Sequence, residues 1–220
     1  MTPVLLVTPT SSEYEAVRAA IGECLAPGRL ALVRCGMGMD AAAALCRRLE
    51  DAAWSGTLAL LGWAGGLSPD LAAGDCVIAD AALDREGHHV LLAAPDLSGV
   101  TAGPVLCVPE PLATPQAKRD GQRSGALAVE MEAYPLAAWT AARSLPFIHA
   151  RVILDAVDED LPDLGDALDA QGRVHPGRMV RRLLAHPRTI FNVLWMARRV
   201  RELGPVLGWL ARAVVATALP

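Results

Sequence analysis

Short apolar runs alternate with longer segments rich in alanine and leucine through the first three quarters of the chain. The apolar runs end in clusters of Gly, Pro, Ser or Thr and predict buried strands, whereas the longer segments have charged flanks and predict helices. We expect strands at residues 4–7, 30–33, 57–61, 76–79, 105–108, 127–129 and 147–154, and residues 89–92 could pair at a sheet edge. We expect helices at residues 11–24, 40–53, 114–122 and 132–143, the first of them capped by Ser11 or Ser12.

This order of elements predicts an α/β fold with a largely parallel sheet that helices cover on both faces. Ligands of such sheets bind beyond the carboxyl ends of the strands. We assign residues 1–169 to this domain and residues 170–220 to a basic, amphipathic helical extension packed on or beside it. In the extension, Pro176, Pro187 and Pro205 punctuate three predicted helical stretches.

The charge of the chain is divided unevenly between these two parts. Residues 1–169 carry 11 Lys or Arg and 23 Asp or Glu, a net charge of −12, whereas residues 170–220 carry nine Arg and one Glu, a net charge of +8. Two interpretations stay open: the extension lies on an anionic membrane surface, or it packs on the core or on a second subunit. Nucleic acid is not an expected partner, because the basic segment lacks interleaved aromatic side chains.

Several sequence features favour a cytoplasmic protein without a metal. The first residues do not form a leader peptide, and no uncharged apolar run reaches the roughly 18 residues of a spanning helix. The five cysteines are odd in number and lack C-x-x-C spacing, which favours reduced thiols. His88 and His89 are neighbours that would point to opposite faces of a strand, so we expect no metal site there.

Three predicted strand ends carry candidate chemistry. Residues 62–66 are mostly small, which lets a ligand approach the backbone closely. Residues 129–132 place two carboxylates around a methionine, and such a carboxylate can accept hydrogen bonds from sugar hydroxyls while the thioether packs on the ribose. Asp155 follows an apolar strand, where burial raises a carboxyl pKa and favours proton donation. The ordinary alternatives are a glycine-rich turn, glutamates at a helix start and an N-cap aspartate.

Taken together, the motifs resemble those of the nucleoside phosphorylase and nucleosidase superfamily, especially its methylthioadenosine/adenosylhomocysteine nucleosidase branch. The resemblance rests on Gly36-Met37-Gly38, on residues 62–67 with Gly74-Asp75, on Val129-Glu130-Met131-Glu132-Ala133 and on Arg151-Val152-Ile153-Leu154-Asp155, and it spans residues 4–165. It implies a three-layer sandwich with a mixed, mostly parallel central sheet. More loosely, residues 170–212 are similar to the tail of hopanoid-associated phosphorylases.

The resemblance also implies a role for each motif. Asp155 would donate a proton toward N7 of the purine, and Glu13 matches the position that activates water in the hydrolytic branch. Glu132 would bind the ribose hydroxyls with Met131 packed against the sugar. The remaining substrate-binding candidates are Glu130, Gly65, Gly66 and Trp63, and the candidates for phosphate or another nucleophile are Gly36, Gly38 and Arg34.

The activity that the resemblance implies is cleavage of a purine N-glycosidic bond, with release of adenine from adenosylhopane, a lipid-linked nucleoside, as the first expectation. Phosphorolysis and hydrolysis stay open, since Trp63, Leu154 and Leu60 depart from the family pattern and residues 84–113 are short. We expect no cofactor, inorganic phosphate as an optional co-substrate, and a homo-oligomer. The alternatives are a nucleosidase for a small soluble nucleoside and a non-catalytic nucleoside-binding or scaffold protein.

Overall fold

The computed structural model describes residues 2–162 and 189–219. Its strands are β1 (Val4–Thr8), β2 (Leu30–Arg34), β3 (Thr57–Gly66), β4 (Cys76–Leu83), β5 (His89–Leu91), β6 (Thr101–Cys107), β7 (Ala128–Glu130) and β8 (Phe147–Asp155). Its helices are α1 (Ser11–Ile21), α2 (Met39–Asp51), α3 (Pro115–Gln122), α4 (Ala133–Ala141) and α6 (Thr189–Ala218), with a 3₁₀ turn, η1 (Gly22–Cys24). Each strand predicted from the apolar pattern is present, including the edge strand β5.

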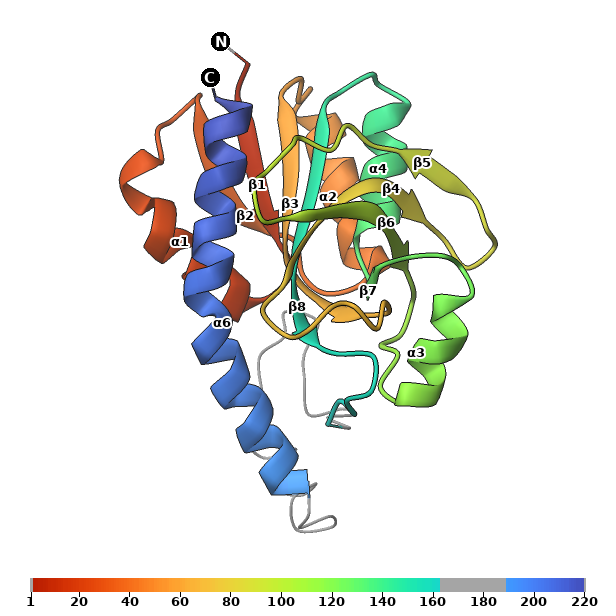
Figure 1. The fold of residues 1–220 in the computed structure, drawn as a ribbon. Coiled ribbons are helices and arrows are strands. Elements are labelled where there is room, and N and C mark those ends of the chain that lie inside the picture. Colours follow the sequence, from red (N-terminus) through yellow and green to blue (C-terminus); the bar gives the residue numbers. More distant parts are fainter. Residues whose placement is uncertain (1, 163–188, 220) are drawn as a thin grey trace.

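The strands form one mixed sheet that partly closes on itself (Figure 1). β3, β8, β4, β6 and β7 make a ring, because each pairs with the next and β7 pairs back with β3. β1 and β2 extend the sheet beyond β3, and β5 extends it beyond β4. Of the pairings among the described residues, five are parallel and three antiparallel. The expected mixed, mostly parallel α/β sheet is confirmed.

Helices cover both faces of the sheet, as Figure 1 shows, with α1 and α6 on one side and α2 and α4 on the other. The alternation along β3 explains this arrangement, because successive side chains of a strand point to opposite faces. Leu58 and Leu60 pack with α2 and α4, whereas Ala59 and Leu61 pack with α1 and α6. The result is the three-layer sandwich that the resemblance implies.

β3 is longer than its apolar run predicts. The glycine-rich residues 62–66 belong to the strand and do not form a turn after it. Gly65 pairs with Val129 of β7 on one side and with Asp155 of β8 on the other, so the small residues lie where three strands meet. The first helix also begins differently: Thr10 caps α1, and not Ser11 or Ser12.

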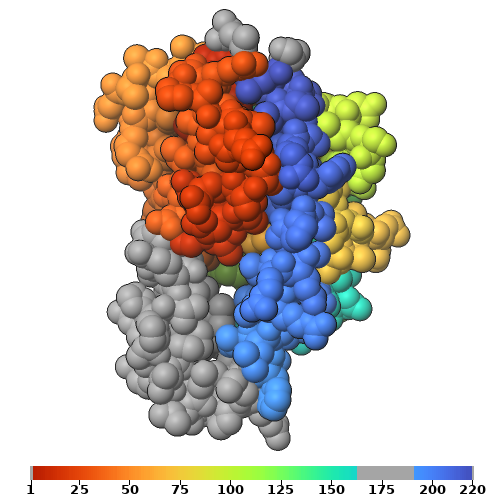
Figure 2. Space-filling view, turned by 90° about the vertical axis from the view of Figure 1, so that its left-hand side faces the viewer, coloured from red at the N-terminus to blue at the C-terminus, as the bar shows by residue number. Residues whose placement is uncertain are grey.

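α6 is one continuous helix of 30 residues with Pro205 inside it, so the predicted break at Pro205 is wrong. A proline removes one helical hydrogen bond, but packing on the core can outweigh that loss. Leu207 and Leu210 are fully buried, and a Cβ atom on Gly208 would lie 2.8 Å from the Cβ of Ala20 in α1. Figure 2 shows α6 running along the molecule beside α1. The second half of α6 therefore packs on the core.

The first half of α6 is more exposed. Phe191 is 73% exposed and Leu194 is 60% exposed. Within the described residues, no helix is both long enough and apolar enough to cross a membrane. The predicted helical stretches around Pro176 and Pro187, and the predicted domain boundary after residue 169, lie outside the described residues.

Candidate active site

A buried arginine lies at the centre of the candidate site. Arg151 occupies the middle of β8 and is only 1% exposed. Its Nη2 atom makes an ion pair with Glu130 and lies 3.2 Å from Oε2 of Glu132, and its Nη1 atom lies 3.9 Å from Oε1 of Glu13. Burying these charges is costly unless they are paired and hydrogen-bonded, and one guanidinium cannot neutralise three carboxylates. We call these four residues the Arg151 centre.

Glu13 reaches the Arg151 centre from the first turn of α1. It is the N3 residue of a capping box, in which its Oε2 accepts a hydrogen bond of 2.6 Å from the Thr10 amide. Its Oε1 accepts a hydrogen bond of 2.8 Å from the amide of Trp63 in β3. Burial raises the pKa of Glu13, and Arg151 and these hydrogen bonds offset only part of that rise. The carboxylate is thus fixed in place and more basic than an exposed glutamate.

Glu130 and Glu132 have different environments although two residues separate them. Glu130 accepts hydrogen bonds from the amides of Glu132 and Ala133, at 2.9 and 3.0 Å, besides its ion pair. Burial opposes its ionisation, but Arg151 and these bonds hold its pKa below the ordinary value. Glu132 accepts a hydrogen bond of 2.7 Å from Gly38, and burial raises its pKa to about 8 against the effect of Arg151. Arg151 therefore neutralises mainly Glu130.

The close approach of these charged groups requires a residue without a side chain in β3. A Cβ atom on Gly62 would lie 2.3 Å from Nη1 of Arg151 and 2.3 Å from Oε1 of Glu13. Gly38 has φ of +84°, a conformation that favours glycine, and a Cβ atom there would lie 3.9 Å from Cε of Met131. Gly62 thus leaves room for Arg151, and Gly38 allows the left-handed backbone from which its amide reaches Glu132.

Asp155 lies at the end of β8 and is buried beside a second cation, Lys118 of α3. The Nζ atom of Lys118 forms an ion pair with Oδ2 of Asp155. Burial raises the pKa of Asp155, and Lys118 opposes that rise. A Cβ atom on Gly65 would lie 3.3 Å from Oδ2 of Asp155, and one on Gly66 would lie 3.3 Å from the Asp155 carbonyl oxygen. Gly65 and Gly66 therefore flank the candidate acid.

The structure brings Gly38 and Trp63 into contact with the Arg151 centre, whereas Gly36 and Arg34 form their hydrogen bonds elsewhere. The Gly38 amide donates to Glu132, and the Gly36 amide donates to the Pro9 carbonyl at 3.2 Å. Arg34 is exposed and donates to the Ser11 hydroxyl. The Trp63 ring packs against the apolar cluster of α1 and α6, while its amide and carbonyl contact Glu13 and Arg151.

Sequence reasoning gave no role to Arg151, His149 or Lys118. Arg151 had a signal that could have been used, because a charged residue inside an otherwise apolar strand is buried only when it is paired. His149 is fully buried, and its Nε2 accepts a hydrogen bond of 2.9 Å from Nε of Arg151. Burial lowers the pKa of His149 to about 3, so the ring is neutral and orients the guanidinium. Lys118 had no such signal, since it lies in a helix rich in polar residues.

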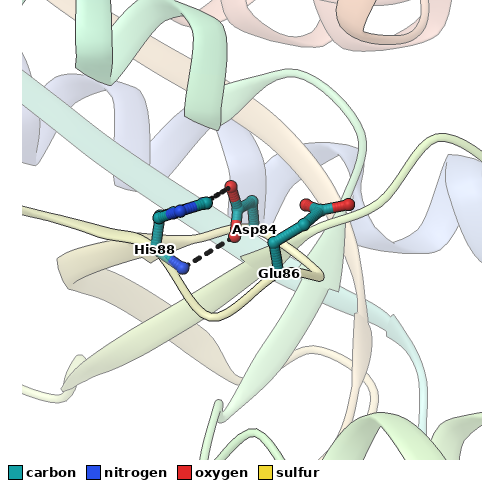
Figure 3. A group of neighbouring side chains, drawn as sticks. All are labelled: Asp84, Glu86 and His88. Atoms are coloured by element: carbon teal, nitrogen blue, oxygen red, sulfur yellow. Dashed lines mark hydrogen bonds and ion pairs between the residues drawn. The ribbon is translucent and has the colours of Figure 1, made fainter.

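One group of possible metal ligands lies among the described residues, at the turn between β4 and β5 (Figure 3). Asp84, Glu86 and His88 place their ligand atoms within 4.8 Å of one another. Asp84 accepts hydrogen bonds of 2.8 Å from the amide of His88 and pairs at 2.8 Å with its ring Nδ1 atom. These bonds close the turn, which accounts for the cluster without an ion. The expectation of no metal site stays a prediction.

Comparison with known proteins identifies the family of this chain. The model of the phosphorylase superfamily matches residues 5–100 and 91–185. The chain belongs to the phosphorylase superfamily. This confirms the resemblance drawn from the motifs. No curated protein matches the sequence.

Solved structures show the same fold at low sequence identity. A methylthioadenosine/adenosylhomocysteine nucleosidase from Neisseria meningitidis, in complex with methylthio-immucillin-A, is 17% identical with a TM-score of 0.63, covering 98% of this chain and 100% of its own. The corresponding enzyme from S. pneumoniae, with a transition-state inhibitor, is 16% identical with a TM-score of 0.64, covering 96% and 99%. A futalosine hydrolase mutant from Helicobacter pylori is 10% identical with a TM-score of 0.68, covering 99% and 100%.

Proposed function

We propose that this member of the phosphorylase superfamily hydrolyses the N-glycosidic bond between a purine and its ribose. The observation that carries the proposal is the Arg151 centre, in which three carboxyl groups share one buried guanidinium. Such a centre suits a reaction in which the sugar carbon gains positive charge as the base leaves, because a carboxylate held near that carbon stabilises the charge as it develops. Asp155 supplies the acid from the end of the same strand as Arg151, where β8 pairs with Gly65 of β3.

Each residue has a defined task in this proposal. Asp155 donates a proton to the departing purine, which makes the base a better leaving group. Glu132 accepts hydrogen bonds from the ribose hydroxyls, and Met131 packs against the sugar. Glu13 takes a proton from the attacking water, a task that its raised pKa suits. Glu130 holds Arg151 and the backbone of residues 132 and 133 in place.

Two observations favour water over phosphate as the nucleophile. The cation of the centre, Arg151, is already engaged by Glu130 and Glu132 and lies 3.9 Å from Glu13, so it is not free to bind a phosphate dianion. In addition, the amides of Gly36 and Gly38 already donate hydrogen bonds within the chain. Phosphorolysis would require these donors to turn toward an anion, whereas water needs only the carboxylate of Glu13.

We propose a lipid-linked nucleoside, adenosylhopane, as the first candidate substrate. The exposed Phe191 and Leu194 of α6 support contact with a lipid or membrane surface, as does the basic extension. The proposed setting is cytoplasmic, at the inner face of a membrane, and the proposed assembly is a homo-oligomer. The similarity to methylthioadenosine nucleosidases favours the second candidate, a small soluble nucleoside.

The test is purine release from adenosylhopane, methylthioadenosine and adenosine, each with and without phosphate. We expect release without phosphate, and a loss of about 10²–10⁴ in kcat for Asp155→Asn with the fold retained. The matched control is Asp158→Asn, an exposed aspartate of the same segment, which should keep the wild-type rate. If none of the three nucleosides releases its base, the chain is a binding or scaffold protein and the proposal is wrong.

A further inference from the structure

Lys118 is a buried cation without a task in the proposed reaction. It is fully buried in α3, where it forms the ion pair with Asp155. Its Nζ atom also donates to the carbonyl oxygen of Ala156 at 2.6 Å and to that of Glu159 at 2.7 Å. An ammonium group has three hydrogens, so one carboxylate and two carbonyls use all of them. This geometry fixes the Asp155 carboxylate relative to both α3 and the segment that follows β8.

The same segment is held from its other side by α6. Arg199 donates to the Leu154 carbonyl at 3.2 Å and makes two hydrogen bonds, of 2.7 and 3.0 Å, with the Glu159 carboxylate. Its guanidinium also lies over the Trp195 ring, 4.4 Å from the ring centre. Glu159 in turn accepts a hydrogen bond of 2.9 Å from the Ala156 amide. A double contact of this kind is stronger and more specific in geometry than a surface ion pair.

We propose that Lys118 is a positioning residue for the acid Asp155, and that Arg199 braces the segment on which Lys118 depends, so that the C-terminal helix supports catalysis from within the molecule. The proposal rests on the proposed function for the role of Asp155 as the acid. In this proposal α6 does more than cover the sheet, and Arg199 of the basic extension has a partner, Glu159, inside the domain.

Charged side chains face Asp155 from three parts of the fold. Among the described residues these are Lys118 from α3, Glu159 from the segment after β8, and Arg199 from α6. The neighbouring strand β3 contributes Gly65, which is uncharged. Burial raises the pKa of Asp155, Lys118 and Arg199 lower it, and Glu159 raises it. Removing either cation should therefore raise the pKa of Asp155 and extend its protonated form to higher pH.

The first experiment compares Lys118→Met with Arg119→Met, an exposed neighbour in the same helix. The readouts are the pH profile of kcat/KM for purine release and the carboxyl ¹³C titration of Asp155, identified by its loss in Asp155→Asn. We expect the alkaline limb and the Asp155 titration of Lys118→Met to move up by about one to three pH units, because an opposite charge lowers a carboxyl pKa by that amount. Arg119→Met should keep the wild-type values. An unmoved titration in Lys118→Met would overturn the proposal.

The second experiment tests the brace and does not depend on the folding of Lys118→Met. It compares Arg199→Met with Arg198→Met, whose arginine pairs with Glu202 on the exposed side of α6. Arg199→Met should shift the Asp155 titration in the same direction by less, and Arg198→Met should leave it in place. Equal behaviour of the two variants would contradict the brace. The ¹³C titration needs no substrate, so a wild-type protein without activity would refute the proposed reaction while the titration still decides the role of Lys118.

Discussion

The molecule buries two cations in its described part, Arg151 and Lys118, and the two differ in how their charge is balanced. Around Arg151 three carboxyl groups gather, and because burial raises the pKa of Glu13 and Glu132, the charge of Arg151 is matched mainly by Glu130. Lys118 faces one carboxylate and two backbone carbonyls, so its charge is matched by Asp155 alone. Burial and ion pairing thus act at both Arg151 and Lys118, but they produce two sites with different chemistry.

The difference shows how β3 and β8 can hold a candidate base and a candidate acid in one fold. At the Arg151 centre burial, which Arg151 offsets only in part, leaves Glu13 and Glu132 with raised pKa values, which suits a group that takes a proton from water. At Lys118 the single ion pair keeps the carboxylate oriented while burial keeps its pKa above the ordinary value. Pairs of acids with opposed environments are a recognised arrangement for acid and base catalysis.

The largest effect is expected from removing the cation of the Arg151 centre. Arg151→Met leaves three buried carboxylates without their partner, and breaking a buried ion pair on one side costs about 3–5 kcal/mol. We expect loss of activity and a lower free energy of unfolding, measured by denaturant titration. Arg18→Met, which removes an exposed pair with Glu15, should cost no more than about 1 kcal/mol. A variant at position 151 as stable as the wild type would mean that the carboxylates do not depend on Arg151.

The next prediction separates the catalytic role of Glu13 from its contribution to stability. Glu13→Gln keeps an oxygen that can accept the Trp63 amide but removes the basic group, so kcat should fall by about 10²–10⁴ while the protein stays folded. Steady-state kinetics and a thermal melt measure the two quantities. Glu15→Gln changes an exposed residue of the same helix and should have the activity of the wild type. If Glu13→Gln kept full activity, another group would have to activate water.

The elements predicted from the sequence are correct where the local pattern and the tertiary packing agree. The short apolar runs predicted the strands and the layers, because strands that helices cover on both faces are apolar throughout. The prediction failed at residues 62–66, where the structure continues the strand, because small residues let β3 pair with β7 and β8 together. It failed at Pro205 for a related reason: the packing of α6 on α1 outweighs a local helix breaker.

In the site, the motifs named Glu13, Glu132 and Asp155 as candidates, but they did not predict the cations that lie beside them. Lys118 is distant in sequence from Asp155, and the contact depends on how α3 packs across the end of the ring. Residues 113–118 and 156–161 meet through the hydrogen bond of the Leu161 amide to the Ala113 carbonyl, at 2.8 Å. Without homologous sequences, a contact of this kind carries no local signal.

A smaller effect tests the crowding of the Arg151 centre. Gly62→Ala adds a methyl group 2.3 Å from Arg151 and Glu13, so both side chains must move. We expect a loss of about 1–3 kcal/mol in stability, the usual cost of overpacking a core, with reduced activity. Gly22→Ala is the matched control, because a methyl group there meets nothing within 4 Å. Equal melting temperatures for the two variants would show that the centre is not tightly packed.

The last effect concerns the pH dependence of stability. The pKa of Glu132 is about 8 in the folded protein and 4.5 in its ordinary state. Between these values the unfolded chain has released a proton that the folded protein still holds, so Glu132 makes stability fall as pH rises. Glu132→Gln should flatten that fall. Melting temperatures of both proteins from pH 4.5 to pH 8 measure it, and parallel curves would refute the raised pKa.

We propose that the Arg151 centre selects water as the nucleophile, because its cation is already engaged by carboxyl groups of the chain. The most direct test is to identify the sugar product when purine is released in the presence of inorganic phosphate. We expect a free reducing sugar, formed at the same rate with and without phosphate. A sugar 1-phosphate, formed only when phosphate is present, would contradict this proposal.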